Sequence, residues 1–243
     1  MTYTVLGYCH DTGELGVAVA TYSIAVGSLC PVAKTHTGAL SSQAFVNPEM
    51  KSLGLSLLEQ GFSAGQAVEI LVRGDADKSF RQLGLLDRCG RAAVYTGSNN
   101  RGWAGHRTGD GYAAFGNVLA GGAVVDAMAE AFEHSDGNAL SQRLIVALEA
   151  GRDAGGQMGA MGRLPERSAA ILVCGRSEFD GVDLRVDLHS NAVDELRRVY
   201  DAAAPYAAFN RQRWLAPHEA VPQEAFAASL LSESIASRAN GEQ

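Results

Sequence analysis

The chain has 243 residues, of which 47% are hydrophobic and 19% are charged, and its formal net charge at pH 7 is −7. This composition is typical of a globular protein with one large core. The acidic balance argues against nucleic acid and anionic membranes as partners, because both are bound by clusters of lysine and arginine. With no basic start before an apolar run and no apolar stretch of about 18 residues, we expect a cytoplasmic protein without a signal peptide or membrane span.

The four cysteines are scattered along the chain at Cys9, Cys30, Cys89 and Cys174. No close cysteine pair and no Cys/His spacing of the zinc or redox kind occurs among them. We therefore expect reduced thiols, no metal site and no cofactor. The partner that fits this chain is a small molecule or a peptide-like ligand.

Residues 2–21 predict a β-hairpin. Asp11-Thr12-Gly13 supplies turn residues, and Leu15 to Ala20 is short and apolar enough for a buried strand. Removal of Met1 would leave the α-amino group of Thr2 beside its own hydroxyl. An amine with an ordinary pKa of about 8 can take the hydroxyl proton, which makes the threonine a nucleophile. The alternative is that Thr2 only begins a strand.

The segment after Pro31 predicts a third and a fourth strand, up to Ala44. By the period-two alternation of a strand, Lys34 and His36 share one face with Val32. A lysine on a buried sheet face would be a functional residue. The alternative is that Lys34 lies at an edge or on a solvated face.

Two helices are predicted next. Asn47-Pro48 marks the start of the first, which contains the leucines of residues 53–58. Ser63 begins the second as its N-cap, with Gln66 at the spacing of a capping box, and Gly74 ends it.

A second hairpin is predicted over residues 80–95, followed by a glycine-rich segment over residues 103–117. This segment carries Trp103, His106 and Arg107, and its glycines would let the backbone approach a ligand closely. It does not continue into a dinucleotide or phosphate-loop pattern, so we do not expect nucleotide binding. A plain hairpin turn held by side-chain hydrogen bonds is the alternative.

The remaining pattern predicts helices over residues 124–132, 140–150 and 193–204 and a third hairpin over residues 167–188. The loop at residues 155–166 is either a lid or a plain surface connection.

Strands and helix pairs thus alternate along the chain, which indicates an α+β fold with paired helices segregated from antiparallel sheets. Two stacked sheets between two helical layers would bury all of these elements. We expect this domain to cover residues 1–204, and residues 205–243 to form a C-terminal helical arm.

Several short segments resemble the domain-of-unknown-function family 1028 over Thr2 to Leu196. They are Thr2-Tyr-Thr-Val, Gly13-Glu-Leu-Gly-Val-Ala-Val-Ala20, Ala25-Val-Gly27, Ser42-Gln-Ala-Phe-Val-Asn-Pro48, Gln82-Leu-Gly84, Tyr95-Thr-Gly97, Trp103-Ala-Gly-His106, Gly116-Asn117 and Ala127-Met-Ala-Glu-Ala-Phe132. Members of that family are classed with the N-terminal nucleophile (Ntn) hydrolases. The resemblance implies a four-layer αββα sandwich and a role for Thr2 in cleaving amide bonds, with its α-amine as base.

Comparison with the proteasome-type branch of the Ntn hydrolases gives one match and one departure. Lys34 falls about where that branch keeps the lysine that lowers the pKa of the nucleophile, whereas Ala20 stands where it keeps an aspartate. We therefore predict an amide-bond hydrolase for a small peptide-like or acylated amine substrate. Thr2 is its nucleophile, Lys34 lowers the pKa of Thr2, and Asn117 or a backbone N–H holds the oxyanion.

The alternative is a catalytically inactive ligand-binding or assembly protein on the same fold. In that protein a ligand pocket would be formed by Gln43, Asn47, Trp103, His106 and Arg107, with Trp103 giving apolar area and Arg107 pairing with a carboxylate.

Large aromatic residues beyond residue 205 predict assembly into a homo-oligomer, most simply a C2 dimer. Pro217 and Pro222 would break this segment into a helix, an extended arm and a second helix. The alternative is that the segment folds back onto its own chain.

Overall fold

The structure is a computed structural model that describes residues 1–177 and 180–241, and of residues 233–241 only the backbone. The chain divides into two compact units, Met1–Arg197 and Arg198–Gln243. Each unit is described by itself. No helix in the described residues is long and apolar enough to cross a membrane.

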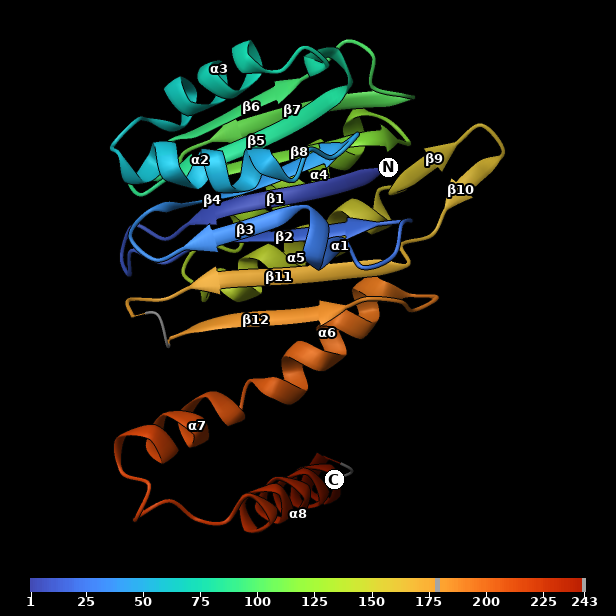
Figure 1. Ribbon diagram of the computed structural model, residues 1–243. Helices are drawn as coiled ribbons and strands as arrows, with labels where there is room; N and C mark the ends of the chain where they lie inside the picture. Colours follow the sequence, from blue (N-terminus) through green and yellow to red (C-terminus); the bar gives the residue numbers. More distant parts are fainter. Residues whose placement is uncertain (178–179, 242–243) are drawn as a thin grey trace. The chain divides into compact units, whose positions relative to one another are not determined.

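The larger sheet of the first unit has eight strands, all paired antiparallel (Figure 1). The N-terminal hairpin lies at its centre, since the strand order is β10-β9-β8-β1-β2-β11-β12 and β7 pairs with β8. The strands are β1 (Thr2–Tyr8), β2 (Leu15–Thr21), β7 (Trp103–Gly109), β8 (Tyr112–Leu119), β9 (Gln157–Gly159), β10 (Gly162–Leu164), β11 (Ser168–Cys174) and β12 (Gly181–Val186).

The smaller sheet has four antiparallel strands in the order β3-β4-β5-β6. They are β3 (Pro31–Lys34), β4 (Gly38–Ala44), β5 (Arg81–Asp87) and β6 (Ala92–Thr96). A short helix α1 (Val26–Leu29) precedes this sheet, and a 3-10 turn η1 (Lys78–Phe80) precedes β5.

Each sheet is covered on one face by a pair of helices (Figure 1). Helices α2 (Glu49–Glu59) and α3 (Ala64–Gly74) pack on the smaller sheet, and α4 (Gly122–His134) and α5 (Leu140–Asp153) pack on the larger one. The capping box of Ser63 and Gln66 fixes the start of α3, as the sequence predicts.

The two sheets face each other through an apolar cluster that joins β1, β2 and β8 to β4 and β5. Leu6 and Phe115 of the larger sheet lie in this cluster with Ala39 and Leu86 of the smaller sheet, and all four are fully buried. Gly84 permits the close approach, because a methyl group at this position would overlap the ring of Phe115. The protein is therefore a mixed α+β protein with two antiparallel sheets.

The second unit consists of helices. It holds the end of α6 (Ala192–Ala203), then α7 (Tyr206–Leu215) and α8 (Gln223–Gly241). Phe209 of α7 stacks on Phe226 of α8 with ring centroids 4.2 Å apart, and Tyr206 meets Phe226 edge-on at 5.2 Å. The break between α7 and α8 contains Pro217 and Pro222, where the sequence predicts it.

Two sequence predictions of local structure were wrong. His36 does not continue the strand of Lys34: β3 ends at Lys34, and His36 has a φ of 58° in the turn to β4. Residues 155–166 are not a plain loop, because β9 and β10 pair within it as a short hairpin. Glycines with positive φ at Gly155, Gly156 and Gly162 allow its tight turns.

Candidate functional site

Thr2 is the first residue of β1, which lies at the centre of the larger sheet. Its side chain lies on the same strand face as Thr4, whose hydroxyl donates to Gln43 Oε1 of β4 at 2.6 Å. Thr2 therefore faces the smaller sheet, and it is only 5% exposed. Burial at a strand end next to the chain terminus fits a hydroxyl that is held for chemistry as well as one that only begins a strand.

The carbonyl oxygen of Met1 accepts hydrogen bonds from two hydroxyl groups. Thr2 Oγ1 donates to this carbonyl at 2.5 Å, and Thr21 Oγ1, at the end of β2, donates to the same oxygen. The two hydroxyl oxygens lie 3.3 Å apart. The hydroxyls of Thr2 and Thr21 are thus gathered around the Met1–Thr2 peptide bond.

Asn117 lies directly across from Thr2 in the pairing of β1 with β8. It is 1% exposed, and its side-chain amide donates to Gln82 Oε1 of β5 at 2.9 Å. The amide carries a second N–H on the same nitrogen. The structure therefore places Asn117 beside Thr2, with its orientation fixed from the opposite sheet.

Gln82 is the centre of a buried polar chain between the sheets. Its Oε1 accepts from Gln43 and Asn117, and its Nε2 donates to Thr96 Oγ1 at 3.0 Å and to the carbonyl of Gly116 at 2.8 Å. Thr96 Oγ1 in turn lies 3.3 Å from His106 Nδ1. Hydrogen bonds thus run from Asn117 of β8 through Gln82 and Thr96 to His106 at the edge of the larger sheet.

Backbone strain gathers around the Thr2 end of the strands. Val118 has a φ of 56° at the bulge that directly follows Asn117, and Ala44 has a φ of 70° directly after Gln43. Left-handed backbone is unfavourable for side chains with a Cβ, above all for valine, and costs about 1–3 kcal/mol per residue. Such strain is typical of functional sites, where surrounding contacts hold it in place.

The chain terminus lies in a partly desolvated place. Burial lowers the pKa of the Met1 α-amine to about 6, against an opposing effect of Cys30 and with a smaller lowering by Arg101. Burial also raises the pKa of the Cys30 thiol to about 11, so this thiol stays protonated at neutral pH. Sequence reasoning missed Thr21, Cys30 and Arg101 as neighbours of Thr2, since no local spacing marks them.

Lys34 is the one predicted catalytic residue that the structure does not bring to Thr2. It is 52% exposed and forms an ion pair with Glu59 of α2. The next residue, Thr35, bonds to Cys174, which pairs with Leu15 at the far end of the hairpin. Strand β1 spans about 20 Å between its ends at about 3.3 Å per residue, so Lys34 cannot lower the pKa of Thr2. Lys34 was matched to the proteasome-type lysine by its position in the sequence. That match does not hold in space, because β3 runs away from the Thr2 end and Lys34 is its last residue.

The residues predicted to form a ligand pocket divide into two groups. Trp103 and His106 line one hollow of about 540 Å³ together with Thr96, Ser98 and Asn100. Trp103 is 38% exposed, and burial lowers the pKa of His106, so that its ring is neutral at pH 7. This hollow lies at the open edge of β7.

The other predicted pocket residues lie elsewhere. Gln43 is fully buried in the polar chain, and Asn47 uses its side chain to accept from the backbone N–H of Glu49 at 3.1 Å. Arg107 forms ion pairs with the α4 carboxylates of Glu133 and Glu130. Arg107 is therefore held by the protein's own acidic groups and does not line the hollow.

The chain matches, over residues 2–196, the model of a family of unknown function, DUF1028. The chain belongs to the DUF1028 family. A crystal structure of protein SPO2555 from Silicibacter pomeroyi, of the same family, is similar to this DUF1028 chain with a TM-score of 0.77 and 32% sequence identity, over 85% of this chain and 93% of that one. No curated protein matches the chain significantly.

Two solved structures of Anbu, an ancestral beta-subunit, are weakly similar to the DUF1028 chain. The protein from Yersinia bercovieri gives a TM-score of 0.39 with 14% identity, over 84% of this chain and 94% of that one. A Gly-1 mutant of Anbu from Hyphomicrobium sp. strain MC1 gives 0.40 with 11% identity, over 85% of this chain and 96% of that one.

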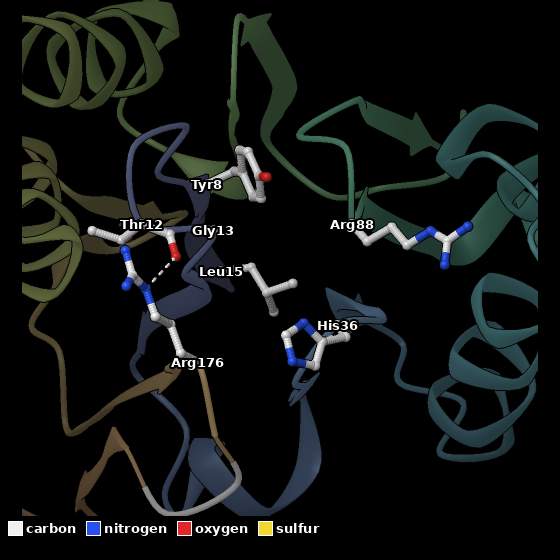
Figure 2. A pocket seen from close by; sticks show the side chains of 7 residues that line it. All are labelled: Tyr8, Thr12, Gly13, Leu15, His36, Arg88 and Arg176. Atoms are coloured by element: carbon white, nitrogen blue, oxygen red, sulfur yellow. Dashed lines mark hydrogen bonds between the residues drawn. The ribbon is translucent and has the colours of Figure 1, made fainter.

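A second hollow, of about 240 Å³, lies at the turn between β1 and β2, at the end of this hairpin that is far from Thr2 (Figure 2). Tyr8, Leu15 and His36 line it with two arginines. Arg176 donates to the carbonyl of Thr12 at 3.3 Å, and in Figure 2 the guanidinium of Arg88 points away from that of Arg176. The two cations therefore do not converge on one ligand.

No group of three or more His, Cys, Asp or Glu side chains that could hold a metal ion occurs in the described part of this DUF1028 chain.

Proposed function

We propose that this DUF1028 protein is an Ntn-type amide-bond hydrolase with a four-layer αββα sandwich, and that Thr2 is its nucleophile once the preceding residue is removed. The substrate is a small peptide-like molecule or an acylated amine. Two facing sheets, each covered by a helix pair, support the fold assignment. One observation carries the activity: the buried Thr2 hydroxyl lies beside Thr21, and Asn117 stands directly across from Thr2 on β8.

The α-amine of Thr2 acts as base in the proposed mechanism. It takes the hydroxyl proton as Oγ1 attacks the carbonyl carbon of the substrate amide, and it passes this proton to the leaving amine. Water then attacks the ester on Thr2 and releases the acid. In the untrimmed chain, burial lowers the pKa of the Met1 α-amine to about 6, which supports a partly desolvated surrounding for an amine at this end of β1.

The oxyanion needs a hydrogen-bond donor beside Thr2. Asn117 supports this role, because one N–H of its amide is bound to Gln82 while a second remains on the same nitrogen. Removing one such donor typically slows acylation by about 100- to 1000-fold. The strained backbone at Val118 helps to hold Asn117 in place.

The test of the activity is time-dependent labelling by an electrophilic β-lactone, read by intact-protein mass spectrometry. Protein verified to begin at Thr2 should gain one lactone mass on Thr2. Thr2→Ser should retain labelling, whereas Thr2→Ala and protein that keeps Met1 should lose it. A Met-free protein that never labels would refute the proposal, and native protein that keeps Met1 quantitatively would do the same.

A binding protein with a disabled site is the second candidate. The hollow with Trp103 and His106 favours it, and so does the position of Lys34 far from Thr2. Saturable quenching of Trp103 fluorescence by a small ligand, in a Met-free protein that does not label, would favour this candidate.

We also propose a C2 dimer that uses the segment after Pro205. The aromatic cluster of Tyr206, Phe209 and Phe226 supports a folded arm, and Trp214 remains 51% exposed on it. A chain that ends at Ala204 should be monomeric by light scattering. An unchanged oligomeric mass with a lower melting temperature would refute the role of the arm.

A further inference from the structure

Three basic side chains belong to segments that meet at the Thr2 end of the sheets. The carbonyl of Arg101 accepts the backbone N–H of Val118 at 3.2 Å, next to Asn117. The backbone N–H of Arg167 donates to the carbonyl of Thr21 at 2.8 Å. These bonds place the backbone of both arginines beside Val118 and Thr21, next to the residues that contact Thr2.

The third cation, Lys51, lies near Cys30. Its Nζ donates to the carbonyl of Ser28 at 3.0 Å, and the carbonyl of Cys30 accepts the backbone N–H of Ser42. The charge of Lys51 acts on Cys30, which in turn interacts with the terminal amine. Lys51, on α2, thus lies near Cys30 at the same end of the sheets.

None of these three cations forms an ion pair with a carboxylate within the described residues. The guanidinium of Arg101 lies 5.4 Å from the ring centroid of Phe45, and that of Arg167 lies 5.4 Å from the ring centroid of Tyr22. Many other arginines have acidic partners, as Arg197 has with Glu149 at 2.8 Å. The buried carboxylate of Glu166 precedes Arg167 in the chain, but it accepts from Gln157 Nε2 at 3.5 Å and forms no ion pair with Arg167 within the described residues.

We propose that the substrate carries a carboxylate near its scissile amide, and that Arg101, Lys51 and Arg167 bind it at the Thr2 end of the sheets. This inference rests on the proposed function. Arginine binds a carboxylate through a planar fork of donors, and lysine adds a point charge. Arg101 is exposed, and Lys51 and Arg167 are half-buried, so solvent screens all three charges. We expect each cation to raise the labelling rate by about twofold to fivefold at low salt.

The experiment uses two matched β-lactones on the full-length, Met-free protein. One bears a carboxylate arm, and the other is its methyl ester. In both, Thr2 Oγ1 adds to the lactone carbonyl, the ring C–O bond breaks, and the hydroxyl proton ends on the released oxygen. The labelling rate constants give a ratio, carboxylate over ester, that cancels differences in the reactivity of Thr2.

We expect the ratio to exceed one at low salt and to fall in about 1 M salt, where the screening length is about 3 Å. Arg101→Gln, Lys51→Gln and Arg167→Gln should each lower the ratio. Arg88→Gln, which removes an exposed cation at the far end of the hairpin, is the matched control and should keep it.

The outcomes separate the two proposals. If neither lactone labels Thr2, the proposed function fails and this inference falls with it. If both label at equal rates, the hydrolase stands and the carboxylate preference is overturned. A preference that survives in all three variants would overturn the assignment to these cations.

Discussion

Replacing Gln82 by leucine tests the buried polar chain that joins the two sheets. Leucine has a similar size but no hydrogen-bonding group, so the change removes the acceptor of Gln43 and Asn117 and the donor to Thr96 and Gly116. The side chains of Gln82, Gln43 and Asn117 are buried, whereas Thr96 borders the hollow with Trp103. The effect should therefore come from stranded partners and not from lost volume.

The magnitude follows from the groups left without a partner. Two amide N–H groups and the carbonyl of Gly116 lose a hydrogen bond, and each stranded buried group costs about 1–3 kcal/mol. Partial relaxation makes the sum less than additive, so we expect Gln82→Leu to lower the free energy of unfolding by about 3–5 kcal/mol. This is a large share of the roughly 5–15 kcal/mol by which most domains are stable.

Urea unfolding followed by tryptophan fluorescence measures this loss, provided that the signal comes from the first structural unit, Met1–Arg197. The two tryptophans are Trp103 in the first unit and Trp214 in the second. A Trp214→Phe background leaves Trp103 as the reporter of the sheets. Gln60→Leu, at the exposed end of α2, is the matched control and should change stability by no more than about 0.5 kcal/mol.

A loss below about 1 kcal/mol for Gln82→Leu, with an unchanged slope against urea, would refute this reasoning. It would mean that the partners of Gln82 find other bonds at little cost. A loss of the expected size should also slow β-lactone labelling, because Asn117 would no longer be oriented from the opposite sheet.

Three further predictions follow from the packing and the charges. The pKa of the Met1 α-amine is lowered in the fold from 8.0 to about 6, so the unfolded chain binds more protons than the folded chain between these pH values. This group should therefore make the free energy of unfolding rise from about pH 6 to pH 8. Urea melts at several pH values measure this rise, and N-terminal acetylation should abolish it. Gly84→Ala should destabilise the sheets by about 1–3 kcal/mol or more by overlap with Phe115, whereas Gly65→Ala, with no atom within 4 Å, should stabilise by up to about 1 kcal/mol in thermal melts. Phe209→Ala should cost about 3–5 kcal/mol in the second unit, seen in the fluorescence of its tryptophan, and leave the transition of the first unit in place.

The sequence predicts the hairpins and helices well where local chemistry is strong. The turn residues before Leu15 and the capping box at Ser63 act over a few residues, and both appear where expected. The short hairpin of β9 and β10 was missed because its strands of three residues carry too weak an alternation.

The site was harder to predict because it is assembled from distant segments. Asn117 could be placed beside Thr2 through a family resemblance, but Thr21, Arg101 and Arg167 come near Thr2 only through sheet pairing and loop contacts. The predicted role of Lys34 was wrong for the same reason. A residue at a matching sequence position does not occupy the matching place in space when its strand runs in a different direction. Arg107 was misjudged because its acidic partners lie on α4, beyond the hairpin that contains it.

Under the proposed function, the burial of Thr2 sets an order of events during synthesis. An aminopeptidase must hold its substrate as a free, extended end, yet in the finished fold Thr2 is 5% exposed and the Met1 carbonyl is held by two hydroxyls. The partner strand β8 emerges from the ribosome only after more than 100 further residues, about 5–20 s later at about 5–20 residues per second. Trimming has that interval in which to act. Chains that miss it close around the untrimmed bond, so the active fraction of a preparation would record a race between excision and folding, and rapid overproduction would lower it.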